Sequence, residues 1–292
     1  MGGRATLRAM LNILIVVVLG ATVAVAGSVD GARWNSVPVL LLCAALAFVI
    51  QWLAFIPAYL RQTERYYDLT GSATYLTVTA LALLLTPDPG LRGWIIGACI
   101  AVWALRLGSF LFRRITSDGS DSRFDRLKPN PQRFLFTWTL QGLWVVMTAA
   151  CGLAAITASS DAPFGAAGWL GLLVWVTGFS VEVLADNQKR RFRARHGSER
   201  FIDSGLWRLS RHPNYFGEIL LWAGVALMAL PALSGWALLT LVSPVFVFVL
   251  LTRVSGIPML EKKGSKRWGD DPAYQRYCRQ TPLLVPFLGR TG

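Results

Sequence analysis

Long apolar segments alternate with short polar connections along the whole chain. Eight of these segments reach or approach the roughly 20 residues that a helix needs to cross a bilayer. They lie near residues 10–27, 38–60, 72–87, 93–112, 134–158, 164–185, 215–231 and 234–257. The third and the seventh segments are short, which is typical of tilted or partly re-entrant helices. The pattern predicts an all-α protein, a polytopic transmembrane helical bundle of seven or eight spanning helices.

The number of spans depends on the first segment. Arg4 and Arg8 precede an apolar run that ends near Ala24-Val25-Ala26, which also satisfies the pattern of a cleaved signal peptide. Cleavage would leave seven spans and would keep every other connection on its side. We favour a retained first helix, because the segment from residue 37 onward is itself able to direct insertion.

Basic residues mark every second connection. Of the 29 Lys and Arg residues, all but three lie at the N-terminus, in alternate connections or in the C-terminal part of the chain. The three exceptions are Arg33, Arg92 and Arg106. The positive-inside rule therefore predicts that both termini are cytoplasmic. We divide the chain into an N-terminal pair of helices, residues 1–60, and a larger domain, residues 61–292, with cytoplasmic loops 113–133 and 186–214 and a tail 258–292.

Composition supports a membrane protein and excludes other classes. Charged residues make up 15% of the 292 residues, whereas about 25% is typical of soluble domains. The net charge of +13 is distributed between apolar segments, so a membrane surface explains it and no nucleic-acid partner is expected. With two His and no CxxC pair, no metal site is predicted. Rossmann, P-loop and GxSxG motifs are absent from the sequence.

One face of the sixth segment carries the first candidate chemistry. At about 100° per residue, Glu182, Asp186, Lys189 and Arg193 fall within about 60° of one another, and Arg190 lies slightly off that stripe. Trp175 and Phe179 share the face further up the helix. An acidic residue at membrane depth is costly and is a functional candidate. The alternative is a ladder of ion pairs with snorkelling arginines that needs no ligand.

The start of the seventh segment carries a second group of candidate functional residues. Pro213 is suited to the first residue of a helix, where its missing N–H costs nothing. The free N–H groups of that helix start lie next to Arg208, Arg211 and His212 in the sequence and predict a phosphate site. A lone histidine at a helix start is more often only a cap. Asn214, Tyr215 and Glu218 follow on the helix.

These motifs resemble the C-terminal signature of the steroid 5-alpha-reductase-like membrane family, in particular its bacterial branch of unknown function. The core of the likeness is Ser-Arg-His-Pro-Asn-Tyr-Phe-Gly-Glu at 210–218, with the acidic and basic residues of 182–193 upstream. Further matching stretches are Arg106-Leu107, Arg113-Arg114, Gly119 to Phe124, Ser255 to Glu261, and Tyr274 to Tyr277 followed by Pro286-Phe287. The likeness covers roughly residues 60–290 and is most specific over 175–290.

The resemblance implies an NADPH-dependent oxidoreductase of a bacterial cytoplasmic membrane, active in lipid metabolism, that reduces a conjugated C=C of a steroid, isoprenoid or acyl lipid. The residues expected to bind the cofactor, from this resemblance and from the helix start described above, are Glu182, Asp186, Arg190, Arg193, Arg211, His212, Asn214, Tyr215, Glu218, Arg106, Arg113, Arg123 and Arg253. Steroid-reducing members carry a catalytic Glu in a Gln-Glu-Leu-Pro-like stretch, but the comparable Ala54–Pro57 has no carboxylate. Tyr66 and Tyr67 are the remaining candidate proton donors.

Two other functions stay open at this point. A membrane S-adenosylmethionine-dependent methyltransferase of the isoprenylcysteine or phospholipid type shares the Arg-His-Pro-x-Tyr-x-Gly helix start, and Glu261, Tyr274 and Tyr277 fit its tail. The surplus of arginines favours a phosphate-bearing cofactor instead. A non-catalytic lipid-binding protein is the third reading. The expected partners are a lipid-like substrate and membrane lipids, and the expected state is a monomer.

Overall fold

The computed structural model describes residues 2–121, 123–160, 162–197 and 199–287. The ends of the predicted domains at residues 1 and 288–292 lie outside this range, as do positions 122 and 198 of the two predicted loops. Within these ranges, eight helices are long and apolar enough to cross a membrane, which confirms the predicted bundle. The orientation of the termini stays a prediction.

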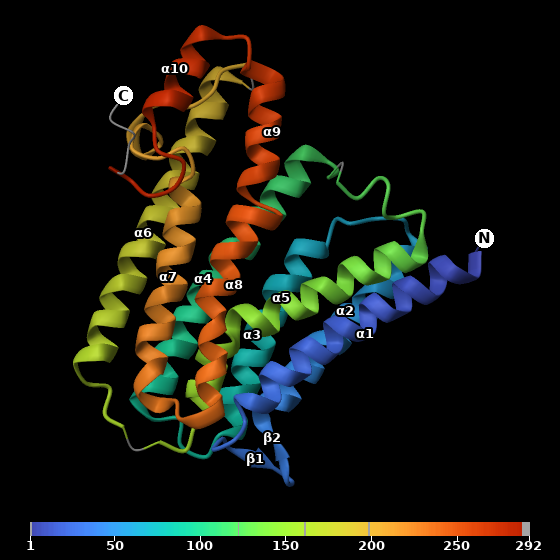
Figure 1. The fold of residues 1–292 in the computed structure, drawn as a ribbon, viewed down its shortest axis with the longest axis vertical. Coiled ribbons are helices and arrows are strands. Elements are labelled where there is room, and N and C mark those ends of the chain that lie inside the picture. The colour runs from blue at the N-terminus through green and yellow to red at the C-terminus, as the bar shows by residue number, and fades with distance from the viewer. Residues whose placement is uncertain (1, 122, 161, 198, 288–292) are drawn as a thin grey trace. The chain divides into compact units, whose positions relative to one another are not determined.

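The elements follow the apolar segments closely (Figure 1). The helices are α1 (Gly2–Ala26), α2 (Val39–Leu60), α3 (Tyr67–Leu85), α4 (Gly90–Asp118), α5 (Pro131–Thr157), α6 (Gly165–His196), α7 (Pro213–Ala229), α8 (Val242–Val249), α9 (Ile257–Trp268) and α10 (Pro272–Gln280). A short hairpin, β1 (Arg33–Trp34) and β2 (Val37–Pro38), separates α1 from α2. As predicted, α7 begins at Pro213 and α6 continues beyond the apolar segment through Arg193; it ends at His196, inside the predicted loop 186–214.

The eighth predicted segment is not one regular helix. It comprises a 3₁₀ helix over Gly235–Leu241, then α8, then a π-helical turn over Leu250–Val254, before α9 begins. Pro244 and Pro258 each lie in the first turn of a helix, where the absent N–H breaks no intrahelical hydrogen bond. Apolar periodicity alone does not reveal these changes of helix type.

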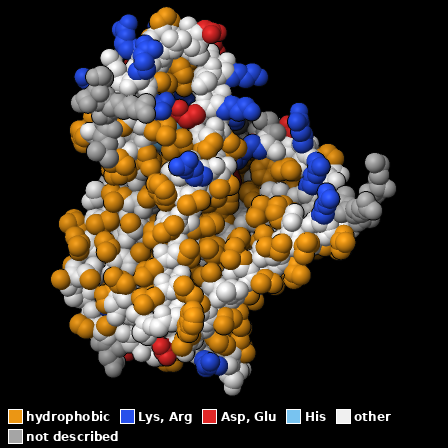
Figure 2. Space-filling view, viewed as in Figure 1, with side chains coloured by type: hydrophobic (Ala, Val, Ile, Leu, Met, Phe, Trp, Pro, Cys, Tyr) orange, Lys and Arg blue, Asp and Glu red, His pale blue; other side chains and the backbone are white. Residues whose placement is uncertain are grey.

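Two compact units make up the chain. The N-terminal unit comprises the chain up to Gly168 together with Met228–Ser243, and the C-terminal unit comprises Trp169–Leu227 and the chain from Pro244. Each is described by itself below. Hydrophobic side chains cover much of the visible surface (Figure 2).

In the N-terminal unit, α5 is the central helix. It packs against α1, α2, α3 and α4, and 89% of its apolar window is buried, as expected for a helix that is apolar all round. Polar side chains link the helices: Gln51 Nε2 donates to Thr74 Oγ1 at 2.8 Å, and Gln141 Nε2 donates to the Tyr67 carbonyl at 3.0 Å. Such bonds between helices supply specificity where lipid offers no hydrophobic driving force.

In the C-terminal unit, glycines bring α6 and α7 into close contact. A Cβ at Gly217 would lie 2.6 Å from the backbone of Gly178 and Glu182, and one at Gly224 would lie 2.6 Å from the Trp175 nitrogen. Small residues at such crossings let two backbones approach in a membrane. The crossing fixes the helix face that carries Trp175 and Glu182.

Candidate cofactor pocket

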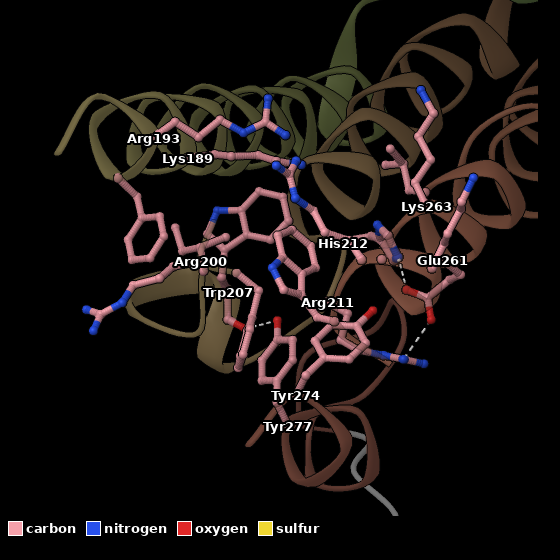
Figure 3. A pocket seen from close by; sticks show the side chains of 18 residues that line it. Lys189, Arg193, Arg200, Trp207, Arg211, His212, Glu261, Lys263, Tyr274 and Tyr277 are labelled. Carbon is pink, nitrogen blue, oxygen red and sulfur yellow. Dashed lines mark hydrogen bonds and ion pairs between the residues drawn. The ribbon is translucent and has the colours of Figure 1, made fainter. Parts of the chain in front are cut away.

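A pocket of about 490 Å³ lies within the C-terminal unit, between the end of α6, the segment 200–212, α9 and α10 (Figure 3). Its polar lining is strongly cationic, with seven Lys and Arg side chains and one carboxylate. The cations are Lys189, Arg193, Arg200, Arg211, Lys263, Lys266 and Arg267, and the carboxylate is Glu261. Aromatic rings from Phe192 to Tyr277 line much of the remaining wall.

The 3₁₀ turn Gly205–Arg208 attaches one wall of the pocket to α6. Trp207 Nε1 donates to the Ala185 carbonyl at 3.0 Å, and the Leu206 N–H donates to Gln188 Oε1 at 2.9 Å. Gly205 has φ +61°, a left-handed backbone conformation that favours glycine. The Lys189 ammonium lies 4.5 Å from the centre of the buried Trp207 ring, a cation–π contact.

The C-terminal segment closes the wall from the other side. Tyr277 Oη donates to the Trp207 carbonyl at 2.7 Å, and burial raises the pKa of Tyr277, which keeps this donor protonated. The Arg211 N–H donates to the Pro282 carbonyl at 2.9 Å, and Ser210 Oγ donates to the Leu284 carbonyl at 2.7 Å. The tail therefore holds the segment that precedes α7.

Aromatic packing joins α9 and α10. The Phe201 ring lies 5.2 Å from Tyr274, 5.5 Å from Tyr277 and 6.1 Å from Trp268, between ring centres. Gly264 on α9 provides the room for Tyr274, because a Cβ there would collide with the tyrosine hydroxyl. Asp271 caps α10 by accepting the Ala273 N–H at 2.8 Å.

Glu261 binds the two residues in front of Pro213. Its Oε2 lies 2.7 Å from Arg211 Nη1 and its Oε1 lies 2.8 Å from His212 Nε2 (Figure 3). His212 is 4% exposed and stacks on Tyr215 at 5.7 Å between ring centres. Burial, assisted by the charges of Lys189 and Arg211, lowers the pKa of His212 against the opposing effect of Glu261. The imidazole is therefore neutral at pH 7.

The pocket includes three of the predicted site residues, Arg193, Arg211 and His212. Glu182 and Asp186 are buried in α6, and Trp175 stacks on Phe179 at 4.9 Å as the shared helix face predicted. Neither carboxylate is among the lining residues of this pocket. The proposed cofactor contacts of Glu182 and Asp186 remain predictions.

Five other predicted residues of the C-terminal unit lie outside the lining of this pocket. They are Arg190, Asn214, Tyr215, Glu218 and Arg253. Arg190 donates to Asn187 Oδ1 at 3.0 Å, and Arg253 is exposed on the π-helical turn. Asn214, Tyr215 and Glu218 lie in the first two turns of α7, where Asn214 Oδ1 is buried without a hydrogen-bond partner among the described residues.

The remaining predicted residues belong to the N-terminal unit. Arg106 lies over the Phe110 ring at 5.3 Å, Arg113 is exposed, and Arg123 Nε donates to Asp121 at 2.8 Å. Their cofactor contacts remain predictions.

The two tyrosines proposed as proton donors also lie in the N-terminal unit. Tyr66 is half exposed and stacks on Phe112. Tyr67 Oη donates to the Thr137 carbonyl at 3.0 Å, and its ring contacts Phe124 and Trp138. The hydroxyl of Tyr67 therefore already has a structural acceptor.

Sequence reasoning missed most of the pocket wall. Trp207, Phe201, Arg200, Lys263 and Trp268 were not singled out, although all of them line it. Glu261, Tyr274 and Tyr277 lie in stretches that match the steroid 5-alpha-reductase-like family and also fit a methyltransferase tail, but no contact with a cofactor was predicted for them. The available signal was a tail in which aromatic residues are interleaved with cations over residues 262–279.

The fold and the pocket define a multi-pass helical membrane protein with a cationic, aromatic-walled pocket. Residues 54–281 match the family model described as a protein of unknown function, DUF1295, so the chain belongs to this steroid 5-alpha-reductase-like family. An uncharacterized protein of Schizosaccharomyces pombe is 26% identical over 177 residues, which are 53% of this chain and 49% of that protein. The steroid 5-alpha-reductase DET2 of Gossypium hirsutum is 29% identical over 119 residues, 40% of this chain and 41% of that protein.

The chain thus spans about half, or less, of the length of these two curated relatives. No solved structure matches it.

Proposed function

We propose that this protein is an integral membrane oxidoreductase that uses NADPH to reduce a conjugated C=C bond of a lipophilic substrate, a steroid, an isoprenoid or an acyl lipid. Membership of the steroid 5-alpha-reductase-like family supports the oxidoreductase class. The similarity to a protein named as a steroid 5-alpha-reductase supports the reaction.

The observation that carries the proposal is the charge of the pocket. Seven cations around one carboxylate leave a large positive surplus in a cavity of about 490 Å³. Phosphate groups are the natural counter-charge, since Arg binds them through paired N–H donors and Lys as a point charge. The neighbouring rings of Phe201, Trp207 and Trp268 suit the flat base of a nucleotide. The pocket therefore fits NADPH, which supplies the hydride when bound.

The chain's own residues have distinct parts in this proposal. Arg193 on α6 and Lys263 on α9 bind phosphate, and the ring of Trp207 packs beneath Lys189. Glu261 holds Arg211 and His212 at the start of α7. Asn214 is proposed as a further contact because its buried Oδ1 has no partner among the described residues.

The substrate side of the reaction rests on the apolar helices. A lipophilic molecule would reach the protein from the bilayer, and a bacterial cytoplasmic membrane is the proposed location. Tyr66 remains the better-placed of the two proposed proton donors, because the hydroxyl of Tyr67 is bound to Thr137. We propose that the protein works as a monomer.

A methyltransferase using S-adenosylmethionine is the second candidate. The Glu261 carboxylate and the aromatic walls of the pocket are groups that hold a sulfonium cation. The seven cations of the same pocket weaken this reading, since S-adenosylmethionine carries no phosphate.

Ligand titration of the full chain in detergent separates these functions. NADPH should quench the tryptophan fluorescence, because Trp207 and Trp268 line the pocket, and S-adenosylmethionine should not. Lys263→Ala should weaken NADPH binding roughly fivefold by removing one phosphate contact. Lys262→Ala is the matched control: this exposed neighbour on α9 is not among the lining residues.

Each other outcome has a definite meaning. Quenching by S-adenosylmethionine alone would replace the reductase by the methyltransferase. Binding of neither ligand would leave a lipid-binding protein without either cofactor. Equal affinities of the two lysine variants would move the NADPH site away from this pocket.

A further inference from the structure

The contact between His212 and Glu261 fixes which nitrogen of the histidine carries the proton. Arg211 Nη1 lies 2.7 Å from Glu261 Oε2, and His212 Nε2 lies 2.8 Å from Glu261 Oε1. The guanidinium keeps the carboxyl group ionised, and an ionised carboxylate only accepts hydrogen bonds. Nε2 must therefore be the N–H that donates to Glu261.

The other ring nitrogen is consequently an acceptor. Burial lowers the pKa of His212, so the ring is neutral near pH 7 and Nδ1 keeps its lone pair. The Nδ1 atom is enclosed and has no hydrogen-bond partner among the described residues. His212 itself is only 4% exposed.

An enclosed acceptor without a donor is costly, and proteins rarely leave one. His212 belongs to the wall of the pocket, so a ligand group that enters the pocket beside the ring would supply the missing donor. Besides the hydroxyls of Tyr274 and Tyr277, the titratable groups of this wall that offer acceptor atoms are Glu261 and His212, next to several cations that can only donate.

We infer that His212 Nδ1 accepts a hydrogen bond from a hydroxyl or N–H group of the bound ligand, and that Glu261 is the positioning residue that sets this tautomer. The inference deepens the proposed function and rests on it, since the ribose hydroxyls and the amide and amine groups of NADPH are such donors. In this arrangement the cations of the pocket bind the phosphates, and His212 Nδ1 accepts a hydrogen bond from a hydroxyl or N–H group of the same ligand.

Two isosteric variants separate this role from a purely structural one. In His212→Asn the side-chain oxygen replaces the Nδ1 acceptor, but the side chain is too short for the contact with Glu261. In His212→Gln the longer amide replaces the Nε2 donor, and no acceptor remains near Nδ1. We expect His212→Gln to weaken NADPH binding about tenfold and His212→Asn to stay within about threefold of the wild type.

The opposite ranking, with His212→Gln the better binder, would make the Glu261 contact the only role of His212 and would overturn the inference. Thermal unfolding of both variants in detergent shows whether they fold. The affinity ranking is read only from variants that unfold within a few degrees of the wild type, and the NMR measurement on unaltered His212 decides if either does not.

The tautomer is measured directly by ¹⁵N NMR of histidine-labelled protein. The chain has two histidines, so His196→Gln, at the exposed end of α6, leaves His212 as the single signal. We expect a neutral ring with the proton on Nε2, and an Nδ1 shift towards hydrogen bonding when NADPH is added. Glu261→Ala should remove the preference for the proton on Nε2 of His212.

If the His212 ring of the free protein is protonated, or carries its proton on Nδ1, the inference is overturned regardless of the result with NADPH. NADPH binding with an unchanged Nδ1 signal overturns the inference but leaves the proposed function standing. Failure of the wild type to bind NADPH overturns the proposed function and, with it, the ligand contact of His212 Nδ1.

Discussion

Glu64 illustrates, at the scale of single residues, how a charge outside the spanning helices is held. It is 6% exposed, with Lys128 Nζ at 2.7 Å from Oε2 and the Asp121 N–H at 2.7 Å from Oε1. Burial by itself raises the pKa of Glu64, but these hydrogen bonds and the charge of Lys128 outweigh it and lower the pKa. A carboxylate with a lowered pKa stabilises the fold above its ordinary value of 4.5 and loses that contribution as the pH falls.

Glu64→Gln should therefore destabilise the protein at pH 7, by about 1–3 kcal/mol, because Lys128 loses its closest anion. The loss should shrink on acidification towards pH 4, where Glu64 of the wild type begins to protonate as well. Thermal unfolding in detergent from pH 7 to pH 4 measures both effects.

Asp125→Asn is the control for Glu64→Gln. Asp125 also faces Lys128, at 3.4 Å, but its side chain is 59% exposed, so the change should cost less than about 1 kcal/mol. Equal losses for both variants would contradict the stabilising role of the buried pair.

At the same scale, sequence reasoning identified Arg193, Arg211 and His212 but not their setting. Helical spacing places Arg193 on one face of its helix, and Pro213 marks the helix start that follows Arg211 and His212. These residues could therefore be predicted from the sequence. Glu261 lies 49 residues beyond His212 in the chain, and no local pattern predicts that the two meet.

At the scale of elements, the crossing of α6 and α7 depends on glycine. A Cβ at Gly217 would lie 2.6 Å from the Gly178 carbonyl oxygen and the Glu182 nitrogen. Backbone atoms cannot move aside as the end of a flexible side chain can. The crossing positions the first turn of α7, which carries Asn214 and follows His212.

Gly217→Ala should consequently force the two helices apart and destabilise the protein by about 1–3 kcal/mol. It should also weaken NADPH binding, because the start of α7 shifts. Val176→Ile adds one methyl group to α6 at a position that is 47% exposed and should change neither property. Unfolding midpoints and NADPH titrations of the two variants test this, and a neutral Gly217→Ala would refute the close crossing.

At the scale of the whole molecule, the distribution of charge and tryptophan predicts topology. Four tryptophans that are more than half exposed, Trp34, Trp94, Trp169 and Trp236, all lie beside the alternate connections that are poor in Lys and Arg. Tryptophan favours the membrane interface. Arg92, one of the basic exceptions there, is buried and donates to the Ala162, Pro163 and Met228 carbonyls, so its role is structural.

Cysteine labelling of intact bacteria tests this topology. In a Cys278→Ser background, an impermeant maleimide should label Ser160→Cys from outside, and should label Ser265→Cys only after permeabilisation. Both serines are exposed, and Cys43, Cys99 and Cys151 are buried. Labelling of Ser265→Cys in intact cells would invert the proposed orientation and place the pocket outside.

The sequence by itself determined the membrane class, the eight apolar segments, the α7 start at Pro213 and the acidic and basic face of α6. These features follow from the length of apolar runs, from helical periodicity and from proline chemistry, all of which act over a few residues. Only the tertiary structure decided that the segment 200–212, α9 and α10 enclose a cationic pocket, and that Glu261 binds Arg211 and His212. Contacts between segments some 50 to 70 residues apart depend on how side chains pack in space, which no local spacing along the chain encodes.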